Sequence, residues 1–240
     1  MKGDRHFMKL LRVGTPPVAG SAAFTLIEML VVIGIIGLLA ALIVGGTHYA
    51  SSKSKESNVR AELHQLIAAI EAYHARFNQY PPDNVVSRAP LIVNPVTNSL
   101  YYELTGVIVE DDPRKAGGTF RSPNRSQRFA SALTQRYFGV DGIQNADPDP
   151  KQVKNFLPQL KTAQSRAINS LPGDQPQTEL QVLVVPVPWP LTRADQPTRI
   201  RGLNPWRYVS TQPTNNPATY DLWAEYLDGK DLKIIGNWSK

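Results

Sequence analysis

Residues 23–46 read AFTLIEMLVVIGIIGLLAALIVGG, and this stretch decides the fold that the sequence predicts. After Glu28, the 18 residues from Met29 to Gly46 carry no charge. As a helix they would span about 27 Å, close to the hydrocarbon core of a bilayer, which is about 30 Å thick. We therefore predict that residues 24–46 form the transmembrane half of a helix.

The leader, residues 1–23, is basic. It holds four basic residues against one acid and so carries half of the chain's net charge of +6. By the positive-inside rule the leader stays in the cytoplasm, and the C-terminal part lies outside it. The remaining chain is only weakly basic, so nucleic acid is not an expected partner. The absence of cysteine excludes a disulfide scaffold, a thiolate zinc site and a cysteine nucleophile.

Three other interpretations of the apolar run compete. A secretory signal peptide would need a small-residue cleavage site, for which Ala50-Ser51-Ser52 is the candidate. A plain signal anchor is the second, and a buried soluble helix, disfavoured because the run has no polar face, is the third. Glu28 distinguishes between these interpretations, because burying an unpaired carboxylate in lipid costs several kcal/mol of free energy. A helix that packs beside identical helices has a use for this acid if Glu28 meets a neighbour's N-terminal ammonium.

The residues from Ala23 to Ile33 resemble the class III signal of type IV pilins and of type II secretion pseudopilins. In that family a prepilin peptidase cuts before the Phe and methylates the new N-terminus, which implies cleavage between Ala23 and Phe24 here. The family's Glu stands fifth in the mature chain, as Glu28 would. The family usually has Gly before the cut, whereas this chain has Ala23.

The next segment, residues 47–80, has the pattern of an amphipathic helix half that leaves the bilayer. Its apolar residues recur at steps of three and four, as on one face of a helix. They are Val59, Leu63, Leu66, Ile67, Ile70, Tyr73 and Phe77. We expect one helix from Phe24 to about Asn78, roughly 80 Å long, that stops at Tyr80-Pro81-Pro82 because proline cannot continue the hydrogen-bond ladder.

The resemblance continues in two later segments, one at the end of the helix and one at the C-terminus, where it is closest to the major pseudopilin. The segment 72–81 resembles that protein's exit from helix to loop, and 203–240 its C-terminal β region, with the ending Ile235-Gly236-Asn237-Trp238. The resemblance implies an α+β, pilin-like fold, in which the long N-terminal helix, with its transmembrane and amphipathic halves, packs against a small antiparallel β-sheet. Residues 81–202 do not match the family and are predicted to be an insertion of loops and short helices.

Local patterns predict the elements of the middle and the tail. Turn formers throughout 84–123 predict loops, with one short element around Leu100–Leu104. Helical spacing predicts helices over Ser126–Phe138 and Lys151–Asn169, the second kinked or split at Pro158. Strands are expected at Leu180–Val187, Arg207–Ser210, Leu222–Tyr226 and Leu232–Ile235.

Candidate chemistry is sparse in this sequence. No P-loop or Gly-x-Ser-x-Gly occurs, and His64 and His74 lack a metal-ligand spacing, so we expect no enzyme and no required cofactor. Basic residues at 114, 115, 121, 125, 128 and 136 favour a solvated face over a phosphate-binding one. In major pseudopilins the loop before the closing strand binds calcium, which places Asp228 and Asp231 as candidate ligands. The family's glycine- and acid-rich stretch is missing here, and an Asp-Gly turn is the alternative.

The sequence therefore predicts a structural subunit of a type II secretion pseudopilus. It would be held in the bacterial inner membrane by one span, with its C-terminal domain in the periplasm. Its partners would be the prepilin peptidase, other pilin-like subunits, and the inner-membrane assembly platform with its ATPase. The alternatives are a pilin of a type IV pilus for adhesion, motility or DNA uptake, which often carries a disulfide, and a membrane-anchored periplasmic binding protein or enzyme.

Overall fold

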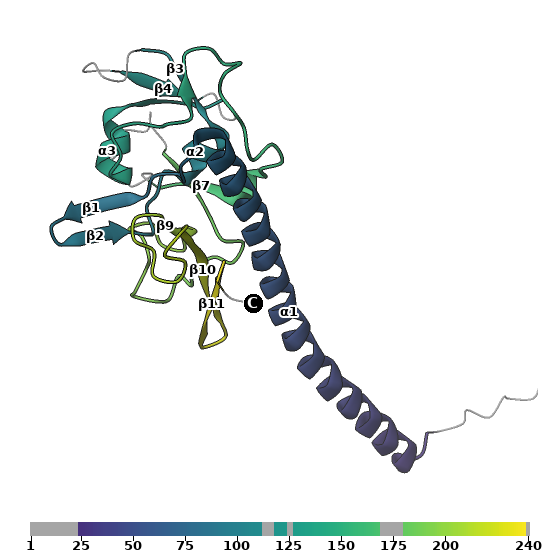
Figure 1. The fold of residues 1–240 in the computed structure, drawn as a ribbon. Coiled ribbons are helices and arrows are strands. Elements are labelled where there is room, and N and C mark those ends of the chain that lie inside the picture. Colours follow the sequence, from purple (N-terminus) through teal and green to yellow (C-terminus); the bar gives the residue numbers. More distant parts are fainter. Residues whose placement is uncertain (1–23, 112–117, 124–126, 169–179, 239–240) are drawn as a thin grey trace, which may run out of the picture. The chain divides into compact units, whose positions relative to one another are not determined.

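The computed structural model describes residues 24–111, 118–123, 127–168 and 180–238, without the side chains of residues 42–48 (Figure 1). The predicted leader and Ala23 lie outside these residues. The chain divides into two compact units, residues 1–48 and 49–240. We describe each unit by itself.

Helix α1 runs from Leu26 to Phe77, 52 residues, close to the range predicted from the apolar periodicity. It ends three residues before Tyr80. Asn78 adopts the left-handed conformation, with φ of 55°, and its N–H donates to the carbonyl of His74 at 2.8 Å. Asparagine tolerates this conformation, so a C-terminal cap ends the helix before the prolines are reached.

The predicted apolar stripe of α1 is confirmed as part of the core of the 49–240 unit. Val59, Leu63, Ile70 and Tyr73 are each at most 3% exposed. They share one cluster with buried aromatic residues of the C-terminal region, including Trp206. A helix with one apolar face is stabilised chiefly by burying that face. In this helix the buried face consists of several large side chains.

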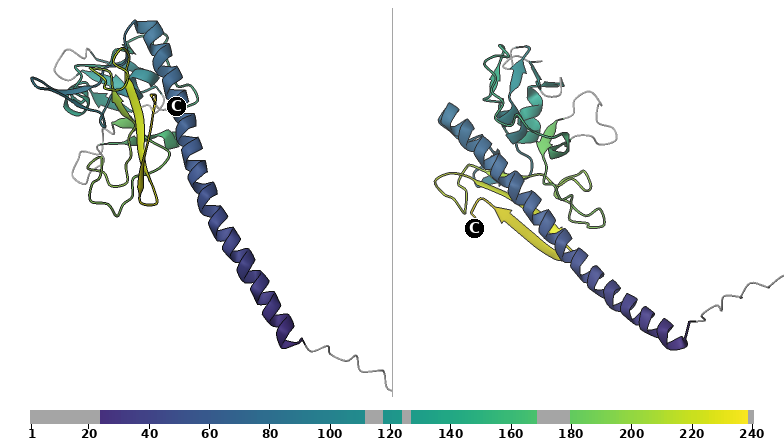
Figure 2. Two further views of the ribbon diagram at one scale, coloured as in Figure 1. Left: turned by 60° about the horizontal axis from the view of Figure 1, so that its bottom comes forward. Right: turned by 90° about the vertical axis from the view of Figure 1, so that its right-hand side faces the viewer.

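The C-terminal region forms an antiparallel three-stranded sheet in the order β11-β10-β9. Its strands are β9 (Arg207–Val209), β10 (Asp221–Asp228) and β11 (Asp231–Gly236), which confirms the three strands predicted there. On one face of β10, Leu222, Ala224 and Tyr226 are buried in the cluster that contains the α1 stripe. Figure 2 shows β10 and β11 beside the part of α1 that belongs to this unit.

The predicted fold class, with one small antiparallel sheet, is wrong, because the strands of the described residues form four separate sheets. One pairs β1 (Asn84–Arg88) with β2 (Leu91–Asn94), and another pairs β7 (Ser165–Ala167) with β8 (Gln181–Leu183). The fourth has the order β5-β4-β3-β6 and includes a parallel pair, β3 with β6. Its strands are β3 (Val107–Val109), β4 (Thr119–Arg121), β5 (Arg128–Ala130) and β6 (Ala146–Asp147).

The predicted fold class is also wrong about a membrane-spanning helix half. Throughout the described part of the chain, no helix is apolar over a length that could cross a membrane.

The middle of the chain differs from its prediction in several places. The short element at Leu100 is confirmed as α2 (Leu100–Thr105), but the loops expected over 84–123 contain strands β1 to β4. Only the second half of the helix expected over 126–138 forms, as α3 (Ala132–Phe138), because residues 128–130 pair with β4 instead. The helix expected over 151–169 is absent from the described residues 151–168, where turns, the 3₁₀ helix η1 (Thr162–Gln164) and β7 occur.

Candidate functional site

The described N-terminus of α1 is closed by a capping box. Thr25 Oγ1 accepts a hydrogen bond from the Glu28 N–H at 3.3 Å, and the Glu28 carboxylate accepts from the Thr25 N–H at 2.8 Å. The hydroxyl of Thr25 also donates to this carboxylate at 2.8 Å. This arrangement satisfies N–H groups that a helix leaves free at its first turn. Within one chain, Glu28 therefore caps its own helix.

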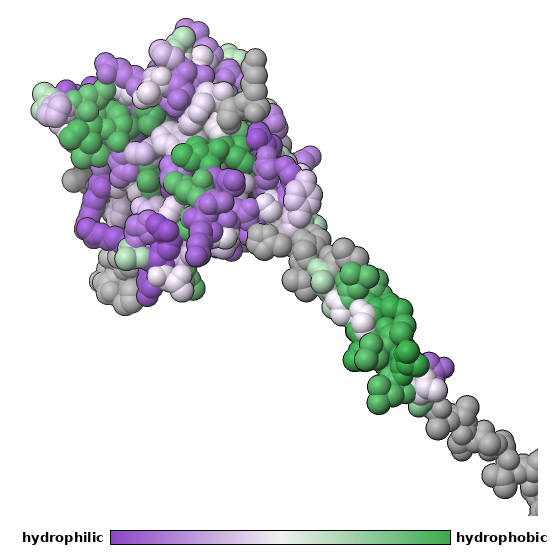
Figure 3. All heavy atoms as spheres, turned by 90° about the horizontal axis from the view of Figure 1, so that it is seen from below, coloured by the Kyte–Doolittle hydropathy of each residue, from purple (hydrophilic) through white to green (hydrophobic). Residues whose placement is uncertain are grey.

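The helix residues that follow the cap are not buried by any other described residue. All residues from Phe24 to Ala41 are exposed, with large apolar side chains from 46% exposed at Val32 to 83% at Leu26. Figure 3 shows this segment as a hydrophobic surface on the face in view. An apolar surface of this extent marks a contact with other molecules or with lipid.

The predicted site residues fall into two separate places. Phe24 is 72% exposed and, with Glu28, lies at the start of α1. Asp228 and Asp231 lie at the turn of the β10–β11 hairpin, where they face each other as the last pair of the ladder. Ala23 is outside the described residues, so the geometry of the predicted cleavage site is not described.

Asp228 ties the β10–β11 hairpin to α1. Its Oδ2 accepts a hydrogen bond from the hydroxyl of Ser52, and its Oδ1 lies 3.7 Å from the ammonium of Lys55. Gly229 has φ of 65° and forms the turn with Lys230, as the Asp-Gly dipeptide favours. The described residues hold no group of three or more His, Cys, Asp or Glu side chains arranged for a metal. A calcium ion at Asp228 and Asp231 stays a prediction, and it would compete with Lys55.

We expect Asp228→Ala to lower the free energy of unfolding by about 1–2 kcal/mol, because it removes a hydrogen bond and an ion pair. The matched control is Asp231→Ala, at an exposed position, for which we expect less than about 0.5 kcal/mol. Urea denaturation of both variants, in EDTA and in calcium, measures the difference. If both variants lost the same unfolding free energy, and only in calcium, the result would contradict a stabilising contact of Asp228 with Ser52 and Lys55. It would instead support a metal site shared by the two aspartates.

The predicted basic surface is partly neutralised. Glu110 lies 2.8 Å from Arg121 and 2.6 Å from Arg128, and Arg128 contacts both of its carboxylate oxygens. The Arg128 guanidinium, and after it the Arg121 guanidinium, holds the pKa of Glu110 below its usual range. Arg136 instead lies over the ring of Tyr137, 5.7 Å from its centroid. Residues 114, 115 and 125 of the predicted basic surface lie outside the described residues.

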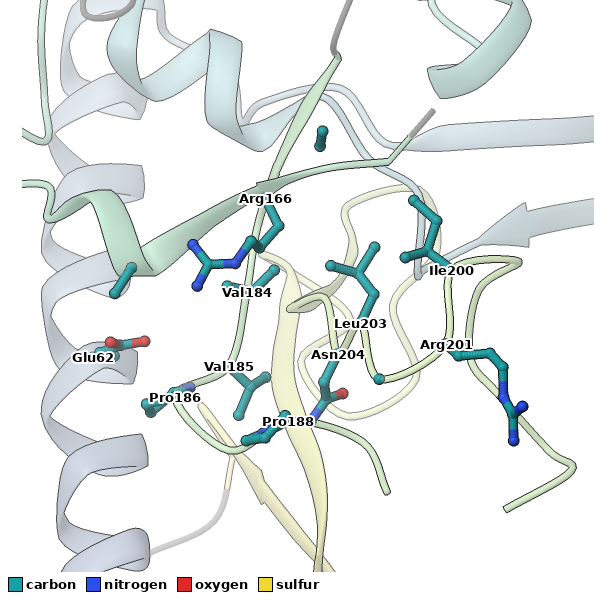
Figure 4. Close-up of a pocket in the computed structure, with 13 residues that line it drawn as sticks. Glu62, Arg166, Val184, Val185, Pro186, Pro188, Ile200, Arg201, Leu203 and Asn204 are labelled. Atoms are coloured by element: carbon teal, nitrogen blue, oxygen red, sulfur yellow. The ribbon is translucent and has the colours of Figure 1, made fainter. Parts of the chain in front are cut away.

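A cavity of about 490 Å³ lies between α1, β7 and the segments around 185 and 202 (Figure 4). Glu62 of α1 and Arg166 of β7 point toward each other across it, while Arg201 points away. Burial raises the pKa of Glu62. The remaining lining is mostly apolar, such as Val184 and Leu203, and contains no serine, threonine, lysine or histidine. Glu62 is the one acidic side chain in this lining, and it faces Arg166.

Glu103 is a buried acid that sequence reasoning missed. It lies on α2, is fully buried, and accepts hydrogen bonds from the Tyr73 hydroxyl at 2.9 Å and from the N–H groups of Gln144 at 3.1 Å and Asn145 at 3.2 Å. Burial raises the pKa of Glu103 to about 7, although these hydrogen bonds act to lower it. The acid therefore joins α1, α2 and the loop before β6. No sequence motif predicts this buried acid, because the groups that donate hydrogen bonds to it lie 30 to 42 residues away in the sequence.

Comparison with known proteins adds no relative to this description. No family model, curated protein or solved structure matches the chain.

Proposed function

We propose that this chain is a structural subunit of a type II secretion pseudopilus, assembled through its N-terminal helix. The observation that carries the proposal is the apolar surface of residues 24–41, which no other described residue covers and which includes the acid Glu28 near its start. Stacked copies would cover this surface with each other's helices. A fully exposed apolar helix without such a partner would be unfavourable in water.

The proposed steps before assembly are supported by features of the sequence. The basic leader and the uncharged run from Met29 to Gly46 support a precursor held in the bacterial inner membrane, with residues 49–240 in the periplasm. A prepilin peptidase would then cut before Phe24 and methylate it. An assembly platform and its ATPase would move the processed subunits into a filament that supports protein export.

The proposal is tested by expressing the full chain with and without a prepilin peptidase and determining its N-terminus by mass spectrometry. We expect a chain that begins with methylated Phe24 only when the peptidase is present. A chain that keeps residues 1–23 in both cases would overturn the proposal. Loss of secreted enzymes on deletion, rather than loss of twitching or DNA uptake, would support a pseudopilus over a type IV pilus.

We also predict that Ala23→Gly speeds this processing. In the family that the chain resembles, glycine usually precedes the cut. Glycine also lets the peptide backbone approach an active site more closely than alanine does. Conversion of precursor to mature chain can be followed by gel mobility in a pulse-chase experiment. The control is Ala22→Gly, one residue further from the cut, which should process at the wild-type rate. Slower cleavage of Ala23→Gly would contradict the assigned site.

A further inference from the structure

The cavity of about 490 Å³ beside α1 has an apolar wall and a charged one (Figure 4). All residues that line it belong to the 49–240 unit. The charged wall is formed by Glu62 and Arg166, whose side chains point toward each other. Pockets for small molecules have volumes of about 300–1,000 Å³ and combine an apolar lining with a few placed polar groups. The apolar wall includes Val184, Val185, Pro186, Pro188 and Leu203.

The two charged groups face each other without forming an ion pair. The salt bridges among the described residues join other side chains. Arg166 donates from Nη1 to the carbonyls of Thr162 and Ser165, both at 3.3 Å. Its Nε and Nη2 donate to no described residue. The guanidinium is therefore held on one side and offers two donors of its planar fork on the other.

Glu62 is held by its neighbours and keeps capacity to accept hydrogen bonds. Burial raises the pKa of Glu62, while hydrogen bonds from the side chains of Gln164 and Trp206 act to lower it. A carboxylate has about four lone-pair sites, so two donors leave sites for a third group. Because burial penalises the ionised form of this acid, a cation placed in the cavity would stabilise it.

The other long polar side chains of the lining are already engaged. Asn204 donates from its amide to two backbone carbonyls, both at 2.8 Å. Arg201 points away from the cavity and donates to the carbonyl of Leu191. Glu62 and Arg166 are left as one acid and one base that face the same space. A ligand with a charge of one sign would satisfy one of them and oppose the other, whereas a zwitterion complements both.

We propose that this cavity binds a small zwitterion, an amino acid or a short peptide with apolar side chains. The carboxylate of the ligand pairs with the Nε and Nη2 fork of Arg166, whose geometry matches two oxygens. The ammonium of the ligand pairs with Glu62, and its side chain packs on Val184 and Leu203. The inference goes beyond the proposed function, because the cavity lies within the 49–240 unit and leaves the N-terminal helix free.

Isothermal titration calorimetry of the full chain in detergent tests the chemistry of the ligand. The probes are L-leucine, L-leucyl-L-leucine, N-acetyl-L-leucine, which lacks the ammonium, and L-leucinamide, which lacks the carboxylate. We expect saturable binding of leucine or of the dipeptide, and binding at least about tenfold weaker for the two blocked compounds. Tighter binding of leucine identifies a site for free amino acids, and tighter binding of the dipeptide identifies a site for peptides.

Three variants test the residues. Arg166→Gln removes the carboxylate partner, and Glu62→Gln removes the negative charge but keeps an oxygen that accepts from Gln164 and Trp206. The matched control is Arg201→Gln, which changes an arginine that lines the same cavity and points away from it. We expect the first two variants to bind the preferred probe at least about tenfold more weakly, and the control to bind it as the wild type does. Urea denaturation checks that each variant is folded.

Several results would overturn the inference. One is the absence of saturable binding of leucine and of the dipeptide at millimolar concentrations. Another is equal binding of blocked and unblocked compounds, or equal weakening in Arg166→Gln and Arg201→Gln. Glycerophosphoethanolamine, a zwitterion with a phosphodiester, should bind more weakly than the preferred probe, and tighter binding would assign the cavity to a lipid head group instead. None of these results bears on filament assembly, so the proposed function is tested separately.

Discussion

Glu28→Gln should yield a chain that is processed normally but no longer assembles. Glutamine can replace glutamate in a capping box, so the variant keeps an acceptor for the Thr25 N–H and preserves the helix start. It removes only the negative charge. In the proposed filament this charge compensates the N-terminal ammonium of Phe24 in a neighbouring copy, and a charge left unpaired among apolar helices is strongly unfavourable. We expect the sedimenting filament fraction to fall at least about tenfold, the factor that corresponds to a loss of one ion-pair hydrogen bond per contact.

The matched control is Thr25→Val, which removes the hydroxyl that Glu28 contacts and keeps the acid. Valine weakens the helix cap but leaves the charge free to pair with another subunit. We expect Thr25→Val to assemble and Glu28→Gln to fail, with both chains carrying the same processed N-terminus. Assembly of Glu28→Gln at the wild-type level, or equal loss in both variants, would show that Glu28 acts only as a helix cap.

Glu103→Ala should be among the most destabilising substitutions in the 49–240 unit. It leaves the Tyr73 hydroxyl and the N–H groups of Gln144 and Asn145 buried without their acceptor. An unsatisfied buried donor costs about 1–3 kcal/mol, and a cavity adds to this cost, so we expect a loss of about 3–5 kcal/mol in the free energy of unfolding. Urea denaturation of the full chain in detergent measures it.

The same acid should make the stability depend on pH. An unfolded glutamate ionises near pH 4.5, whereas burial raises the pKa of Glu103 to about 7 in the folded chain. Between these values the folded state holds a proton that the unfolded state has lost. The contribution of Glu103 is therefore complete below about pH 4.5 and is lost as the pH rises to about 7, a decrease of about 3 kcal/mol.

Glu103→Gln is the control for this effect, because its side chain has the same size and does not titrate. The difference in unfolding free energy between the wild type and this variant should shrink, or change sign, as the pH rises from 4.5 to 7. Parallel pH profiles would show that Glu103 does not titrate in this range. A difference that grows with pH would mean that its hydrogen bonds outweigh burial and lower its pKa.

Local periodicity predicted the parts of the fold that depend on one segment at a time. The stripe from Val59 to Phe77 and the strands β9, β10 and β11 could be read from the sequence, because each pattern is set by burial of one face. The turn at Asp228-Gly229 could be read as well. The N-terminal part of the candidate site came from the resemblance around Phe24 and Glu28.

The rest depends on pairings between distant segments. β3 is in register with β6, from Val107 to Ala146, and strands of two or three residues carry too little pattern to reveal such a partner. Residues 151–168 have helical spacing, yet Pro158 interrupts the hydrogen-bond ladder and Leu157 enters the core from an irregular segment. Glu103 was missed for the same reason, since its donors come from other segments. A single antiparallel sheet was therefore predicted, whereas the strands of the described residues form four separate sheets.

The positions of the tryptophans have a practical consequence for spectroscopy. All four lie between residues 189 and 238, and Trp189 and Trp206 are buried in the 49–240 unit. Trp223 and Trp238 contact each other, with ring centroids 5.7 Å apart. Tryptophan fluorescence therefore reports the C-terminal region alone, and the apolar helix, which has no tryptophan, contributes nothing to this emission. Unfolding of this region can be followed optically while the helix stays in a detergent micelle, without any added dye.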